Sequence, residues 1–271
     1  MEIRIKSQER WKRTMRKVRR AILRDEPTYY DMFQNPGERY FAKLYLHQIQ
    51  PALQAYLPGR LKILDAGCQA GRLAIPLAQA GHQVIGVDTS AVGLRRAKRH
   101  AKEVGTSLRL IRANLGGWLP AQPGESFDAV VCTEVLYLRQ NHRELLEGLL
   151  RVLRPGGLCF ISHRPRGYYL AEAFGHRDWN AVRLLISGKE GILLGSYYNW
   201  QNREDLELLY RILKVKLIAI TPIGFFSWLA VKPDDLDEEG QDLLFKVETT
   251  FNKDYPGSGR YLLVTGQKEQ G

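Results

Sequence analysis

The chain has 271 residues, of which 44% are hydrophobic and 25% charged, a balance typical of a globular protein with a buried core. No apolar run approaches the roughly 18 residues that a membrane-spanning helix needs, and no apolar secretory segment follows the basic start, so we expect a cytoplasmic location. Cys68, Cys132 and Cys159 lack the Cys-x-x-Cys spacing of metal sites, so we expect buried, reduced thiols and no metal.

The net charge of +11 is concentrated at the N-terminus. Residues 1–24 contain ten Lys or Arg against two Glu, which accounts for +8 of the total. Four apolar side chains recur there at helical spacing, namely Trp11, Met15, Val18 and Ile22. Residues 8–24 are therefore predicted to form a basic amphipathic helix within an N-terminal extension, residues 1–36. The pattern favours a helix that docks on the main domain; an acidic partner, a membrane surface and nucleic acid stay open as alternatives.

Residues 37–271 form the main domain of this interpretation, and an apolar helix over residues 38–56 opens it. Strand-like runs follow at residues 61–64, 84–87, 108–112, 127–132, 158–162, 217–220 and 261–265. Helices are predicted between them at residues 72–80, 90–104, 143–153, from Asn202 onward, and within 234–251. This alternation predicts an α/β fold with a doubly wound, mostly parallel sheet. Ser90 and Asn202 are the expected N-caps of their helices, and Pro76 predicts a late start or a kink in its helix.

The alternation weakens between residues 164 and 201. This segment is rich in aromatic residues and glycine, and its weak periodicity predicts a long irregular insertion after the fifth strand. Such insertions in α/β enzymes often cover a substrate, but they also serve as purely structural excursions over a sheet. The aromatic residues favour neither alternative.

The turn after the first strand is rich in glycine and is accompanied by acidic residues. Asp65 precedes Gly67 and Gly71, and Asp88 ends the second strand about 20 residues further on. A strand, a glycine-rich turn, a helix and an acidic strand end are typical of nucleotide-binding α/β domains. A carboxylate at position 65 would repel a pyrophosphate, whereas it would attract an adenosine compound with a cationic amino group and no phosphate. S-adenosylmethionine has this chemistry.

With these features the chain resembles the class I S-adenosylmethionine-dependent methyltransferases over roughly residues 37–265. The resemblance rests on Leu-Asp-Ala-Gly-Cys-Gln-Ala-Gly at 64–71, Gly-Val-Asp at 86–88, Phe-Asp-Ala-Val-Val at 127–131 and Leu-Leu-Arg-Val-Leu-Arg-Pro-Gly-Gly at 149–157. It implies a seven-stranded Rossmann-like sheet of order 3-2-1-4-5-7-6, with an antiparallel last strand. It also implies that the helix over residues 38–56 covers the cofactor side.

The resemblance also assigns roles to single residues. Asp65 would orient the methionine amino group, and Asp88 would accept both ribose hydroxyls. Asn114 takes the place of the family's usual adenine-contacting acid, and Gln69 takes the place of its commonest middle glycine. The residues expected around the cofactor are Asp65, Gly67, Cys68, Gln69, Gly71, Asp88, Thr89, Asn114, Leu115, Cys132 and Thr133.

Methyl transfer needs a base only if the acceptor must lose a proton, and positioning supplies much of the rate. The candidates for this role are His163, Glu134 and Tyr137, with His142 beside them; His163, directly after the fifth strand, comes first. The aromatic segment favours a small organic acceptor, methylated at O, N or C, with S-adenosyl-L-homocysteine as the second product. Two alternatives stay open, namely an RNA or protein methyltransferase recruited through residues 1–24 and a cofactor-binding partner subunit without catalysis.

Overall fold

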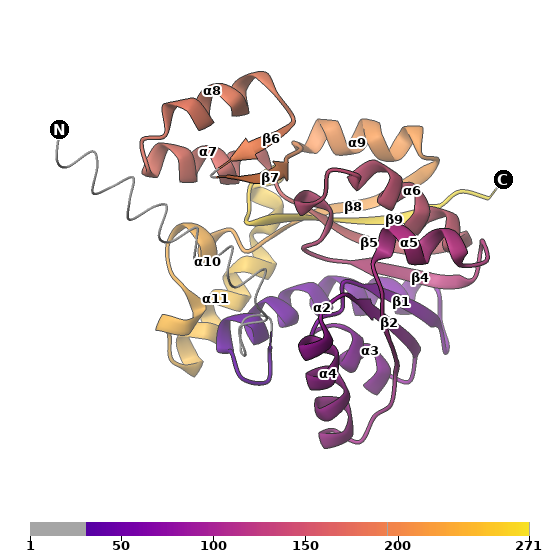
Figure 1. The fold of residues 1–271 in the computed structure, drawn as a ribbon. Coiled ribbons are helices and arrows are strands. Elements are labelled where there is room, and N and C mark those ends of the chain that lie inside the picture. The colour runs from indigo at the N-terminus through magenta and orange to yellow at the C-terminus, as the bar shows by residue number, and fades with distance from the viewer. Residues whose placement is uncertain (1–30, 194, 271) are drawn as a thin grey trace.

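A seven-stranded sheet forms the centre of the computed structural model, which describes residues 31–193 and 195–270 (Figure 1). Its strand order is β3-β2-β1-β4-β5-β9-β8. The strands are β1 Lys62–Ala66, β2 Gln83–Asp88, β3 Arg109–Arg112, β4 Phe127–Cys132, β5 Leu153–His163, β8 Val215–Ile223 and β9 Tyr261–Lys268. The first five strands pair in parallel, whereas β9 runs antiparallel to both of its neighbours. The expected order, with an antiparallel last strand, is confirmed.

Helices cover both faces of this sheet (Figure 1). They are α2 Pro36–Tyr56, α3 Ala74–Gln79, α4 Ala91–Glu103, α5 Leu115–Trp118, α6 His142–Val152, α9 Arg203–Ile212, α10 Phe226–Leu229 and α11 Glu238–Thr250. Short 3₁₀ turns are η1 Leu119–Ala121, η2 Leu136–Leu138, η3 Pro233–Asp235 and η4 Asn252–Asp254. The helix expected over residues 8–24 lies outside the described residues. No helix within 31–193 and 195–270 is long and apolar enough to span a membrane.

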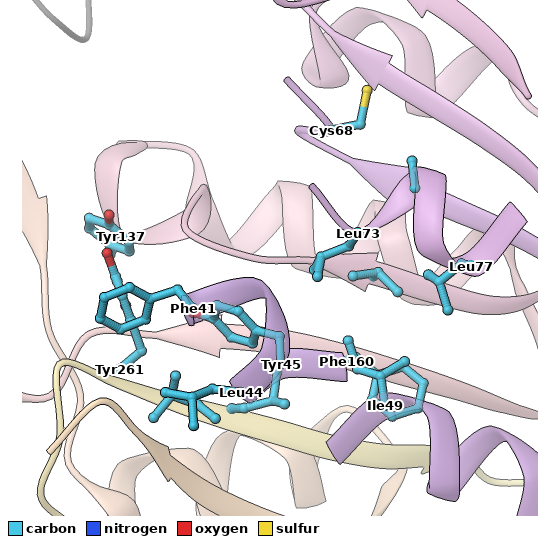
Figure 2. Close-up of a cluster of buried hydrophobic side chains, with 14 of the residues drawn as sticks. Phe41, Leu44, Tyr45, Ile49, Cys68, Leu73, Leu77, Tyr137, Phe160 and Tyr261 are labelled. Carbon is cyan, nitrogen blue, oxygen red and sulfur yellow. The ribbon is translucent and has the colours of Figure 1, made fainter. Parts of the chain in front are cut away.

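Successive strand residues enter two separate cores, because side chains alternate between the faces of a sheet. Ile63 of β1 belongs to the core beneath α2 and α3, and its neighbour Leu64 belongs to the core beneath α5, α6 and α9. Figure 2 shows the first core, in which Tyr45 and Ile49 of α2 pack toward Phe160 of β5. The packing holds α2 against the sheet, close to the carboxyl ends of its parallel strands.

Three local signals in the sequence are confirmed. The Ser90 hydroxyl accepts a hydrogen bond from the Gly93 amide at 2.9 Å and caps α4. Asn202 caps α9 and forms a reciprocal capping box with Asp205. Pro76 lies in the first turn of α3, which starts late, at Ala74, because proline is tolerated there without loss of an intrahelical hydrogen bond.

The expectation of an irregular segment at 164–201 is wrong. This segment forms α7 Arg166–Gly175, α8 Trp179–Ser187 and an antiparallel hairpin of β6 Glu190–Leu193 and β7 Ser196–Asn199. Buried Tyr169 and Ala173 on α7 do have helical spacing. Phe174 and Trp179 are exposed on the outer side, so apolar residues on both faces obscure the periodicity.

Two smaller differences concern short or interrupted elements. No helix is expected between residues 112 and 127, yet α5 and η1 lie there; both are too short to produce a periodic pattern. The fifth strand begins at Leu153 instead of residue 158, because Leu153 pairs with Phe127 before the register shifts. Gly156 has a φ of 74° in this irregular part, a conformation that glycine adopts without strain.

Candidate functional site

A cavity of about 260 Å³ lies at the carboxyl ends of β1, β2 and β4. Most of the residues expected around a cofactor line it, namely Asp65, Gly67, Cys68, Gln69, Asp88, Thr89, Asn114, Leu115 and Thr133. Gly71 and Cys132 do not line it. Cys132 is fully buried, and a β-carbon at Gly71 would lie 2.6 Å from Ile75 Cδ1, so Gly71 serves helix packing.

The turn after β1 brings the backbone to the edge of this cavity. Gly67 has a φ of 90°, and a β-carbon there would collide with Val135, which also lines the cavity. Gln69 has a φ of 45°, and its amide donates to Asp88 Oδ2 at 3.0 Å. The end of β2 thus holds the left-handed backbone of the turn in place.

Asp88 accepts hydrogen bonds through both carboxylate oxygens. Besides the bond from Gln69, its Oδ1 accepts from the Ser90 amide at 2.7 Å. Two oxygens offer about four acceptor sites, so backbone bonding leaves acceptor capacity for a ligand. Asn114 caps α5 through its Oδ1, which accepts from the Gly116 amide at 2.9 Å. The position of Asn114 in the sequence predicted a contact with adenine, and the second lone pair of Oδ1 can accept a hydrogen bond from it.

Asp65 is buried at the tip of β1. Burial raises the pKa of its carboxyl to about 7, while the Arg72 guanidinium opposes the rise and the Asp88 carboxylate adds to it. A cationic group placed in the cavity would stabilise the ionised form of Asp65. The site is therefore suited to a positively charged ligand group.

Arg72 links three elements beside the cavity, and sequence reasoning missed it. Its guanidinium donates to Glu38 at 2.8 Å and to Glu134 at 2.6 Å, and it lies over the Tyr45 ring at 5.4 Å. The Tyr261 hydroxyl donates to the second oxygen of Glu134 at 2.6 Å. The available signal was an arginine directly after the glycine-rich turn, at the start of an apolar helix.

Glu134 lines the cavity, but its carboxylate is occupied by Arg72 and Tyr261. Burial alone would raise its pKa, yet the Arg72 and Arg260 guanidiniums hold the pKa below its usual value. Glu134 has a φ of 62°, and its amide donates to Ser162 Oγ at 2.7 Å. A carboxylate with these partners is a poor base and a good anchor for its neighbours.

His163 and Tyr137 do not line the cavity. His163 is buried with its Nε2 2.9 Å from the Tyr210 hydroxyl, and burial lowers its pKa to about 4. The Tyr137 hydroxyl accepts from Arg164 at 3.1 Å, and burial raises its pKa to about 12. His142, at the start of α6, lies 3.2 Å from the Arg139 carbonyl through its Nδ1. This geometry gives no support to a catalytic role for His163 or Tyr137.

Part of the chain is similar in sequence to known methyltransferases. Residues 63–157 match the family described as a methyltransferase domain. A ubiquinone biosynthesis O-methyltransferase of Pectobacterium carotovorum is 32% identical over 123 residues, covering 43% of this chain and 51% of the relative. The chain thus spans about half the length of the curated relatives it matches.

Solved structures share the fold at low sequence identity. An S-adenosylmethionine-dependent methyltransferase of Methanosarcina mazei aligns with a TM-score of 0.58 at 16% identity, covering 82% of this chain and 98% of that one. Magnesium protoporphyrin IX methyltransferase of Synechocystis, crystallised with S-adenosylhomocysteine, aligns with a TM-score of 0.57 at 16% identity, covering 98% and 99%. The resemblance found in the sequence is confirmed by the methyltransferase-domain match over residues 63–157, and the Rossmann-like methyltransferase fold is confirmed by the strand order and by these structures.

Proposed function

We propose that the protein is an S-adenosylmethionine-dependent methyltransferase that acts on a small organic acceptor. The observation that carries the proposal is the presence of Asp65 and Asp88, from two neighbouring strand ends, in one cavity. Both acids suit an adenosine compound with a cationic amino group and no phosphate. The matched methyltransferase domain contains both residues.

Different residues of the cavity bind different parts of this cofactor. Asp88 accepts from the ribose hydroxyls, and Asp65 pairs with the methionine amino group. Asn114 and Leu115 contact the adenine, and Thr133 flanks the methionine portion. Gly67 leaves space that a β-carbon would fill. The bound cofactor supplies a methyl group on a sulfonium.

Catalysis in this proposal rests on positioning. Glu134 is held by Arg72 and Tyr261, and His163 is buried against Tyr210, so we assign neither of them the role of base. The residues at the carboxyl ends of β4 and β5 hold the acceptor in line with the transferred methyl group, a contribution that requires no proton transfer.

An oxygen atom on a small ring is the first acceptor to test. The curated relative is named as an O-methyltransferase, and its similarity covers 43% of this chain. Three buried free cysteines support a reducing cytoplasm as the compartment. Recruitment of RNA or protein through residues 1–24 is the competing proposal, and it falls on residues outside the described structure.

The test combines binding and turnover on the full chain. Calorimetry with S-adenosylhomocysteine is expected to show saturable one-site binding. Radiolabelled S-adenosylmethionine, mixed with a panel of phenols, catechols and aromatic amines, is expected to label at least one of them. No binding in calorimetry would contradict the proposal outright. Tight binding with no transfer to any small molecule, but transfer to RNA or protein that is lost without residues 1–24, would favour the competing proposal.

A further inference from the structure

Arg164 is a buried guanidinium enclosed by aromatic rings. It follows β5 by one residue and is 7% exposed. Its guanidinium carbon lies 4.1 Å from the ring centre of Tyr168 and 4.4 Å from those of Tyr137 and Tyr261. The ring of Tyr169 lies at 5.9 Å. We call Arg164 and these four tyrosines the arginine cage.

The hydrogen bonds of the arginine cage are incomplete. Arg164 donates to the Tyr137 hydroxyl at 3.1 Å, but its Nε and the Tyr169 hydroxyl are buried without a partner. No Asp or Glu side chain within residues 31–193 and 195–270 lies within 4 Å of the Arg164 guanidinium. A buried donor without a partner is costly, and a buried cation without a counter-ion costs more. Cation–π contacts offset only part of that cost.

The charges around the cage leave an excess of positive charge. Arg260 lies over the rings of Phe41 at 4.8 Å and Tyr261 at 5.5 Å, and it too has no ion pair among the described residues. The two nearby carboxylates, Glu38 and Glu134, are both bound to Arg72. Arg164 and Arg260 thus have no carboxylate partner of their own among the described residues, so an anion bound beside them would offset positive charge.

The cage adjoins the cofactor cavity through Tyr261. One face of the Tyr261 ring contacts Arg164, and its hydroxyl donates to Glu134, which lines the cavity. Tyr137 lies beside Tyr261 (Figure 2), and their ring centres are 5.9 Å apart. A group bound by Arg164 would therefore lie close to the place where a methyl group is transferred.

We propose that Arg164 binds the carboxylate of the methyl acceptor, so that the acceptor is a small aromatic acid. A planar guanidinium pairs with a carboxylate through two parallel hydrogen bonds, which would satisfy its Nε. The Tyr169 hydroxyl supplies a further donor, and the rings of the cage pack against an aromatic acceptor. This inference rests on the proposed function and specifies the acceptor.

The test compares matched acids and amides on the full chain loaded with S-adenosylhomocysteine. Ligand-observed NMR titrations measure the affinity of 4-hydroxybenzoate against 4-hydroxybenzamide and of benzoate against benzamide. The acids are expected to bind about tenfold more tightly, the scale of a charge-assisted hydrogen bond. Arg164→Met is expected to abolish this preference and Arg164→Lys to retain part of it. Arg183→Met, an exposed arginine on α8, is the matched control and retains the full preference.

Each outcome separates this inference from the proposed function. Equal affinity of acid and amide in the unmodified protein, or an undiminished preference in Arg164→Met, overturns the inference while cofactor binding stands. No binding of either acid overturns it as well. If phenyl phosphate binds more tightly than both acids, Arg164 recognises a phosphate, and the assignment of a carboxylate is overturned. Cofactor affinity and circular dichroism show whether Arg164→Met is folded; if it is not, the acid–amide comparison in the unmodified protein decides.

Discussion

Asp65 and Asp88 end neighbouring strands, but their surroundings give them different properties. Asp88 accepts from two backbone amides, which stabilises its charged form. Asp65 is buried, and its pKa is raised to about 7. The charge of Asp65 therefore depends on its neighbours and on a bound cation.

Replacing Asp88 is expected to weaken cofactor binding. Asp88→Ala removes a carboxylate that accepts charge-assisted hydrogen bonds, so the dissociation constant for S-adenosylhomocysteine should rise about 10- to 100-fold in calorimetry. Asp178→Ala is the control, since Asp178 accepts from the Ala181 amide at 3.0 Å as the N-cap of α8. The control should lose about 1 kcal/mol of stability and bind the cofactor normally. Equal affinity of Asp88→Ala and the unmodified protein would remove Asp88 from the site.

Replacing Asp65 is expected to stabilise the ligand-free protein and impair binding. The folded pKa of about 7 lies above the reference value of 3.8, so the folded state holds the extra proton between these pH values. The cost of burying this carboxyl therefore grows as pH rises from 3.8 to about 7, and it is complete above that range. Asp65→Asn should raise the free energy of unfolding at pH 8 by up to about 4 kcal/mol, since each pKa unit corresponds to about 1.4 kcal/mol.

Urea unfolding at pH 8 and pH 5 measures this effect, and the difference between Asp65→Asn and the unmodified protein should shrink at the lower pH. Affinity for S-adenosylmethionine should fall at least tenfold in the same variant, because its amino group loses a charged partner. A variant less stable at pH 8, with unchanged affinity, would refute both parts.

At the scale of elements, the turn between β1 and α3 shapes the cavity. Gly67 has a left-handed backbone, and its missing side chain leaves room for Val135 from the segment after β4. The Gly67 amide donates to the Val87 carbonyl at 2.8 Å, so β2 also holds the turn. Three strand ends therefore meet around this one glycine.

Gly67→Ala is expected to destabilise the fold by about 1–3 kcal/mol, through backbone strain and the collision with Val135. Adding Val135→Ala should recover the steric part of the loss but not the strain. Gly117→Ala in α5 is the control, because nothing in the neighbouring structure lies within 4 Å of the place that a β-carbon would take, and the change should stay within about 0.5 kcal/mol. Urea unfolding measures the free energy of unfolding of all three variants. If Gly67→Ala lowers it no more than Gly117→Ala does, this account is contradicted.

At the scale of the whole molecule, the last strand holds two parts of the sheet together. β9 lies between β5 and β8 and pairs with both. Its Tyr261 and Leu263 enter one core, and Leu262 and Val264 enter the other. Without β9, two strands would expose unpaired edges and both cores would lose side chains.

Removal of residues 257–271 is therefore expected to abolish cooperative unfolding, observed by circular dichroism during heating. Removal of residues 270–271 alone, which lie beyond β9, should leave the midpoint within a few degrees of the full chain. A sharp transition in the longer truncation would show that β9 is dispensable.

Local patterns in the sequence predicted the alternation of strands and helices, and the family resemblance that they support implied the strand order and most of the residues that line the cavity. Glycines at a turn, acids at strand ends and apolar runs are contiguous signals, and the doubly wound arrangement places them at one edge. The prediction of irregular structure for residues 164–201 was wrong because α7 and α8 have apolar residues on both faces, which hides the helical periodicity.

Only the tertiary structure decided the environment of the charged side chains. Arg72 meets Glu38 and Glu134, which are 34 and 62 residues away, and Tyr137 and Tyr261 meet at Arg164 from opposite parts of the chain. His163 belongs to a buried pair with Tyr210, which no spacing in the sequence indicates. Burial and charge pairing depend on which distant residues fold together, and these determine whether a titratable group binds a ligand or serves the fold.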